Sequence, residues 1–242
     1  MKSLGKYLIF LKHTLENREP FRVYVNLFFE ECMVIGIDSI FIVIVVSIFI
    51  GAVTAVQTVY NLVSPLIPLH IVGLIVRDMI ILEIAPTFTA IVFAGKVGSN
   101  IAGGLGTMKI TEQIDALEVM GVNAASYLVL PKIAAGMTMY PLLVIIACFL
   151  GIYGGYFAGT TGHLFTAADY IYGIRNDFTE FNVFFALIKS FVFAFLIVSI
   201  SAYKGFYTSG GALEVGKAST DAVTNSCIAI LIADFLLAYL LV

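Results

Sequence analysis

Charged side chains inside otherwise apolar stretches are the residues of this sequence that could do chemistry. Glu83, Lys189 and Asp234 each lie within a long apolar segment. An ionisable group at membrane depth is costly, so such residues mark ion pairs, relays or binding sites. Lys189 and Asp234 each lie about eight residues from the same end of consecutive segments, which at ~1.5 Å per residue places them at matching depth. We expect an intramembrane ion pair, serving as a structural clasp or as a switch in a transport cycle.

Glu83 has two interpretations. It can contribute to a lipid path, or it can form an internal ion pair with Arg77 or another buried donor that only fixes helix packing. A separate hypothesis is an ion-coupled secondary transporter, in which Glu83 and the other intramembrane charges form a proton or ion relay. The further members of that relay would be Arg77, Asp78, Lys189 and Asp234.

The familiar catalytic and metal-binding patterns are absent from the sequence. Gly98 to Lys109 does not fit the GxxxxGK[ST] phosphate loop, and no strand context precedes it. The three cysteines and three histidines are scattered, without a CxxC or HExxH spacing. No basic stripe suggests nucleic acid. We therefore expect no enzyme, metal site or cofactor in this chain, and any energy for transport would come from a partner or an ion gradient.

Small residues recur every fourth position after Glu83. Gly95, Ser99 and Gly103 form one ladder, and Gly98, Ala102 and Gly106 form another. Such ladders let a second backbone approach closely. Here they indicate a subunit contact or a broken helix beside a functional site. A third ladder at Gly151, Gly155 and Gly159 is interpreted as ordinary helix packing.

A short polar helix is predicted over 111–121, between two apolar segments. Thr111 can cap it, Ile114 and Leu117 give it an apolar stripe, and Gly121 can end it. Its acidic residues are three positions apart and form a ridge beside that stripe. The residues expected to contact something outside the membrane are Thr111, Glu112, Gln113, Asp115 and Glu118.

The elements that must position these residues are membrane helices. Sixty percent of the residues are hydrophobic and 12% are charged, which no water-soluble core could accommodate. We predict an all-α polytopic membrane protein, a single permease domain over 1–242, with an N-terminal interfacial helix over 1–32. About five spans are expected, at 33–57, 69–95, 133–158, 181–203 and 220–242.

Lysine and arginine predict the orientation. The N-terminal segment, residues 96–132 and residues 204–218 together hold ten of them, whereas the opposite connections hold only Arg175. Positive residues concentrate on the cytoplasmic side. The N-terminus and the 111–121 helix are therefore expected in the cytoplasm, and the C-terminus outside.

The stretch from Glu83 to Lys132 closely resembles the MlaE/YrbE permease family, the membrane subunits of ABC-type lipid transporters that work with MCE-domain proteins. The resemblance is carried by Glu83 with Pro86, by the run 94–99, by Gly106 with Met108, and by Thr111-Glu112-Gln113 through Gly121. Weaker similarity covers nearly the whole chain. It includes Gln57, Lys189-Ser190 and Asp234-Phe235.

The resemblance implies a homodimeric permease in the bacterial inner membrane. Its partners would be a cytoplasmic ABC ATPase, which binds ATP and Mg, and a periplasmic MCE protein. Its cargo would be phospholipid moving between inner and outer membranes. The 111–121 helix would couple the ATPase to the spans, and spans 1, 2 and 5 would line the lipid cavity. Positions implied for the lipid path or for helix packing are Gln57, Glu83, Gly95, Gly98, Ser99 and Gly103.

One departure from the family pattern is Leu82, where an arginine usually precedes the glutamate. A structural membrane-assembly subunit without transport is a further alternative. The 111–121 helix is the discriminating feature, because a secondary transporter does not need an outward-facing acidic ridge between spans 2 and 3.

Overall fold

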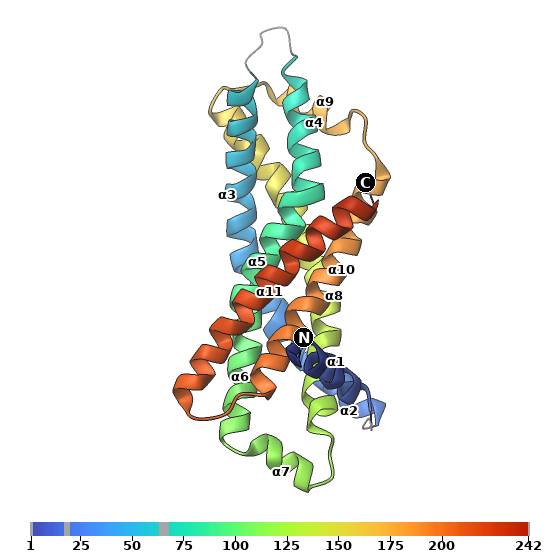
Figure 1. Cartoon of the computed structure of the whole chain (residues 1–242). Coiled ribbons are helices and arrows are strands. Elements are labelled where there is room, and N and C mark those ends of the chain that lie inside the picture. Colours follow the sequence, from blue (N-terminus) through green and yellow to red (C-terminus); the bar gives the residue numbers. More distant parts are fainter. Residues whose placement is uncertain (1, 17–19, 63–67, 242) are drawn as a thin grey trace.

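The computed structural model describes residues 2–16, 20–62 and 68–241, and every regular element in these ranges is helical. Long helices run side by side along an elongated bundle, with α7 at one end and α9 near the other (Figure 1). The prediction of an all-α polytopic membrane protein is confirmed.

Four helical stretches among the described residues are long and apolar enough to cross a membrane: Arg22–Asn61, Ala124–Thr161, Glu180–Phe206 and Ala212–Leu240. They cover the expected spans 33–57, 133–158 and 181–203, and the described part of 220–242. The 38 residues of α8 (Ala124–Thr161) measure ~57 Å at 1.5 Å per residue, well beyond ~30 Å of hydrocarbon. Its ends therefore extend out of the apolar layer.

The expected span at 69–95 is a run of alternating α- and π-helical segments. Pro86 lies inside the longest π segment, where its missing N–H would break a regular α-helical ladder. The helix also continues well beyond Gly95, so the region that follows is not a loop. The segments are α4 (His70–Met79), η2 (Ile80–Phe88), α5 (Thr89–Phe93), η3 (Ala94–Gly98) and α6 (Ser99–Ile110).

The N-terminal region differs from the expected interfacial helix over 1–32. Only α1 (Lys2–Leu15) is a separate helix, whereas α2 (Phe21–Cys32) continues through η1 (Met33–Ile37) into α3 (Asp38–Asn61). Pro20 stands at the start of α2, a position its fixed φ suits, and no breaker follows before α3. Met1 and residues 17–19 lie outside the described residues.

Glycines allow a close contact between α3 and α8. A Cβ added to Gly51 would lie 1.9 Å from the carbonyl oxygen of Gly151, and one on Gly154 would lie 2.3 Å from that of Ile48. Both helices can approach this closely only without side chains there. The ladder at Gly151 and Gly155 thus packs within the chain, as expected.

The remaining helices are short connectors or complete the bundle. α7 (Gln113–Val119) joins α6 to α8, and α9 (Ala167–Arg175) joins α8 to α10 (Glu180–Phe206). α11 (Ala212–Leu241) crosses the bundle diagonally and contacts α10 and α6 (Figure 1). This crossing brings the last helix beside η2, where the intramembrane charges lie.

Candidate functional site: an exposed polar helix, a groove and an intramembrane charge cluster

Lys189 on α10 lies at the centre of the intramembrane charges. Its ammonium nitrogen is 2.7 Å from Asp234 Oδ1, 2.8 Å from Glu83 Oε1 and 3.0 Å from the carbonyl oxygen of Leu82. The ammonium donates hydrogen bonds to Glu83 and to the Leu82 carbonyl, and it forms an ion pair with Asp234. The side chain is fully buried, and its nitrogen also lies 4.6 Å from the centre of the Phe185 ring.

The third acceptor follows from Pro86. In a regular α-helix the N–H of residue 86 would bond the Leu82 carbonyl, but proline has no N–H. Lys189 donates to that oxygen instead. The buried Tyr140 hydroxyl donates to the Pro86 carbonyl at 2.6 Å. Side chains from α8 and α10 therefore satisfy backbone groups around the break in η2.

Glu83 pairs with Lys189 and not with Arg77. The buried Arg77 guanidinium donates to Asp78 Oδ1 at 2.9 Å and to backbone carbonyls at and just beyond the end of α9, which ties α4 to that connection. The Glu83 side chain remains 51% exposed in the single chain. Two carboxylates thus share one ammonium, and Asp234 also accepts a hydrogen bond from Thr87 at 3.2 Å.

The two glycine ladders after Glu83 face different surroundings. A Cβ on Gly98 would lie 2.9 Å from Ser201 Oγ on α10, and one on Gly106 would lie 3.2 Å from Val215 on α11. That ladder packs inside the chain. Gly95 is exposed with open space beside it, whereas Gly103 faces Ser219 Oγ at 3.2 Å. Ser99 donates to the Gly95 carbonyl at 2.5 Å.

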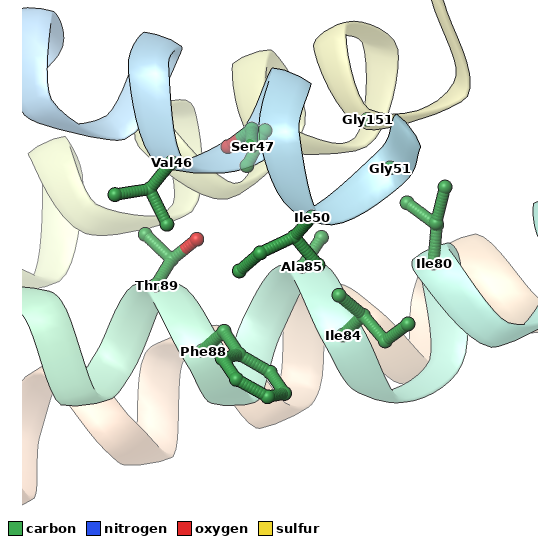
Figure 2. A pocket seen from close by; sticks show the side chains of 11 residues that line it. Val46, Ser47, Ile50, Gly51, Ile80, Ile84, Ala85, Phe88, Thr89 and Gly151 are labelled. Atoms are coloured by element: carbon green, nitrogen blue, oxygen red, sulfur yellow. The ribbon is translucent and has the colours of Figure 1, made fainter. Parts of the chain in front are cut away.

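An open groove of about 600 Å³ lies between α3 and the α4–η2 run. Gln57 lies on the α3 side of the groove, which is lined by both apolar and polar side chains. A much smaller gap of about 10 Å³ shares Ile50, Ile84 and Phe88 with it, and Figure 2 shows these side chains from α3 and η2 converging there. The groove residues are Phe49, Ile50, Val53, Thr54, Gln57, Thr58, Asn61, Met79, Ile84 and Phe88.

Helix α7 begins differently from the prediction. Thr111 does not cap it, because its hydroxyl donates back to the Thr107 carbonyl at the end of α6. Glu112 precedes α7 in the left-handed conformation, with φ 60°, and forms the sharp bend between α6 and α7. A bend at this point requires positive φ, which local sequence patterns do not predict for glutamate.

The end of α7 follows the prediction. Gly121 has φ 82°, its N–H donates to the Glu118 carbonyl, and the Val122 N–H donates to the Leu117 carbonyl. This bond pair is the Schellman motif, in which a left-handed glycine closes a helix.

The exposed face of α7 is both acidic and apolar. Gln113, Glu112, Asp115 and Glu118 are exposed, whereas Ile114 is fully buried. Asp115 pairs with Lys109 at 2.5 Å, and neither Glu112 nor Glu118 has an ion-pair partner among the described residues. The sequence analysis missed Val119 and Met120, which are 88% and 68% exposed. Two apolar residues just beyond the predicted stripe were the available signal.

These features define the class of protein. A multi-pass membrane protein presents a short helix with an acidic and apolar exposed face between the helical run over 70–110 and the long apolar helix α8. Its described residues hold no cluster of three or more potential metal ligands. Such a chain has the architecture of a transporter's membrane subunit.

Comparison with known proteins identifies the family. Residues 28–240 match the family described as "Permease MlaE", and the chain belongs to it. It is 35% identical to a "Probable ABC transporter permease protein" of Rickettsia bellii, over 98% of this chain and 91% of that protein. It is 33% identical to one from Synechocystis, over 88% and 80%. It is 37% identical to "Protein TRIGALACTOSYLDIACYLGLYCEROL 1, chloroplastic" of Arabidopsis thaliana, over 64% and 44%.

Membership confirms the resemblance seen in the sequence. The chain is the permease subunit of an ABC transporter and not its catalytic subunit, which implies an ATPase partner.

Proposed function

We propose that this permease moves phospholipid between the inner and outer bacterial membranes, driven by a cytoplasmic ATPase docked on α7. The observation that carries the proposal is the exposed face of α7, where Glu112 and Glu118 lie beside Val119 and Met120. Exposed apolar side chains flanked by unpaired carboxylates suit a partner groove that is apolar inside and basic at its rim.

Lipid as the cargo is supported by the groove between α3 and η2. Phe49, Val53 and Phe88 supply apolar walls for acyl chains, while Gln57 and Asn61 supply amides for a headgroup. The name of the Arabidopsis relative contains that of a glycolipid. The half-exposed Glu83 lies on the same π segment as Ile84 and Phe88 of the groove.

The proposed assembly contains two copies of this chain, two ATPase subunits that bind ATP and Mg, and a periplasmic MCE protein. Gly95, with open space beside it, is a candidate position for contact between the copies. The distribution of lysine and arginine supports a cytoplasmic N-terminus and α7, with a periplasmic C-terminus.

A second candidate function is ion-coupled transport. It is favoured by the charge cluster, in which two carboxylates share the ammonium of Lys189 and one of them, Glu83, is half-exposed. Such a cluster could exchange a proton during a cycle.

One experiment separates the two functions. The permease is reconstituted with its ATPase and MCE protein into vesicles that contain a fluorescent phospholipid, and lipid transfer to acceptor vesicles is followed with ATP or with an imposed proton gradient. We expect transfer with ATP and none with the gradient alone. Gradient-driven transfer without ATP would favour ion coupling, and lipid extracted with the purified complex would be identified by mass spectrometry.

A further inference from the structure

Asn123 connects α1 and α8 through one side-chain amide. It lies between the end of α7 and the start of α8, where its Oδ1 accepts a hydrogen bond from the Ser126 N–H at 3.2 Å and caps α8. Its Nδ2 donates to the carbonyl oxygens of His13 at 3.0 Å and Glu16 at 2.7 Å, at the C-terminal end of α1. The amide therefore holds α1 against the start of α8.

Both ends of this amide meet backbone groups at helix ends, although the His13 carbonyl also accepts the Glu16 N–H at 3.3 Å. The first N–H groups and the last carbonyl groups of a helix have no partner within it. Only an amide side chain combines an acceptor oxygen with an NH₂ that can donate twice. Aspartate at this position would still cap α8, but it would turn a carboxylate toward the two α1 carbonyls.

The residue that holds α1, Asn123, comes shortly after the end of α7 in the chain. The bond from the Val122 N–H to the Leu117 carbonyl closes α7, and Asn123 is the next residue. A displacement of α7 must therefore move Asn123 with it. Helix α1 also contacts α10. Its buried Phe10 packs against the rings of Tyr203, Phe206 and Tyr207 at the end of α10.

We propose that Asn123 is a positioning residue that transmits movement of α7 to α1, and through the Phe10 contacts to α10, the helix that carries Lys189. The inference rests on the proposed function, because it requires an ATPase on α7. Movement of α7 would then reach the bundle through Asn123 and α1 as well as through the direct chain connections of α7 to α6 and α8.

The test compares Asn123→Asp with Asn123→Ala in the full complex. Asn100→Asp on α6 is the matched control, because it makes the same chemical change at an exposed position away from α1. Spin labels at Ile9→Cys and Leu142→Cys, both exposed, report the distance from α1 to α8 in the permease alone. Lipid transferred per ATP hydrolysed is measured in vesicles.

We expect Asn123→Asp to broaden the distance between the labels and to lower lipid transferred per ATP about tenfold, because two hydrogen bonds are lost and a carboxylate faces two carbonyls. ATP hydrolysis itself should stay within about twofold of the unmodified complex, since α7 and the α8 cap remain. Asn123→Ala should add a loss of folded yield, and Asn100→Asp should change neither ratio nor distance.

Each of the following outcomes overturns the inference. If Asn123→Asp leaves the distance between the spin labels unchanged, Asn123 does not hold α1. If lipid transfer and ATP hydrolysis fall by the same factor in this variant, the role of Asn123 is purely structural. An unmodified complex that moves no lipid with ATP overturns the proposed function and this inference together. ATP-driven transfer with an unchanged ratio in Asn123→Asp overturns the inference alone.

Discussion

At the scale of single residues, the buried ammonium of Lys189 connects three helical segments. Its acceptors come from η2 and α11, while the side chain itself belongs to α10. One of those acceptors is the Leu82 backbone, so the lysine supports the break at Pro86 as well as the charge balance. A structural clasp is thus the first role to test for Lys189 and Asp234, and a switch is the second.

Lys189→Met should be the most damaging change in the cluster. It strands the Asp234 carboxylate and leaves the Leu82 carbonyl without its side-chain donor, and loss of one partner from a buried pair costs ~3–5 kcal/mol. Asp234→Leu should cost less, because Lys189 keeps Glu83 and Leu82 as acceptors. Folded yield and denaturation in detergent measure both.

The double variant Lys189→Met with Asp234→Leu completes a mutant cycle. We expect it to be more stable than Lys189→Met alone, because it removes the stranded carboxylate. Strictly additive losses would show that the pair contributes nothing in the membrane. Recovery of yield without recovery of transport would favour the switch.

At the scale of elements, α7 combines a buried anchor residue with an exposed face, which we propose binds the ATPase. Ile114 is buried against the bundle, whereas Glu112 and Glu118 are exposed and have no ion-pair partner within residues 2–16, 20–62 and 68–241. Val119 and Met120 extend the exposed face. A single exposed ion pair contributes little, so the acidic ridge must be changed as a group.

Reversing Glu112, Asp115 and Glu118 to lysine should abolish ATPase docking. The permease should still insert and fold, because these side chains are exposed in the single chain. Co-purification with the ATPase and lipid-stimulated ATP hydrolysis are the measurements. Glu180→Lys, an exposed acidic residue at the start of α10, is the control at the opposite end of the bundle. Full co-purification of the triple variant would refute the docking assignment.

The glycine ladders give a matched pair of substitutions on one helical run. Gly98→Leu should reduce folded yield sharply, because even a Cβ would lie 2.9 Å from Ser201 Oγ. Gly95→Leu should fold normally, because open space lies beside it. Cross-linking then tests whether Gly95 meets a second copy. A dimer unaffected by Gly95→Leu would exclude Gly95 from that contact. Equal folded yields of Gly98→Leu and Gly95→Leu would contradict the close packing of Gly98.

At the scale of the whole molecule, the two short connecting helices, α7 and α9, lie toward opposite ends of the bundle. α7 lies at one end and α9 near the other (Figure 1), and the lysines and arginines outside the spans gather on the α7 side. This asymmetry predicts how the protein sits in the membrane.

Cysteine labelling checks the orientation. Thr179→Cys, between α9 and α10, should react with a membrane-impermeant maleimide in intact spheroplasts, whereas Gly211→Cys, between α10 and α11, should react only after permeabilisation. Both residues are exposed in the single chain, and the background carries alanine at the three free cysteines. The reverse labelling pattern would invert the proposed topology.

The sequence alone determined the helical class, the positions of most spans, the left-handed end of α7 at Gly121 and the depths of Lys189 and Asp234. These properties follow from hydropathy, from glycine's tolerance of positive φ and from a rise of ~1.5 Å per residue, all of which are local.

Only the tertiary structure decided which groups meet. Depth along a helix does not give the direction in which a side chain points or the helix beside it. The third acceptor of Lys189, the attachment of Arg77 beside α9 and the Asn123 bonds to α1 therefore had no sequence signal. The left-handed Glu112 was equally hidden, because positive φ is uncommon for residues other than glycine and no local pattern predicts it for this glutamate.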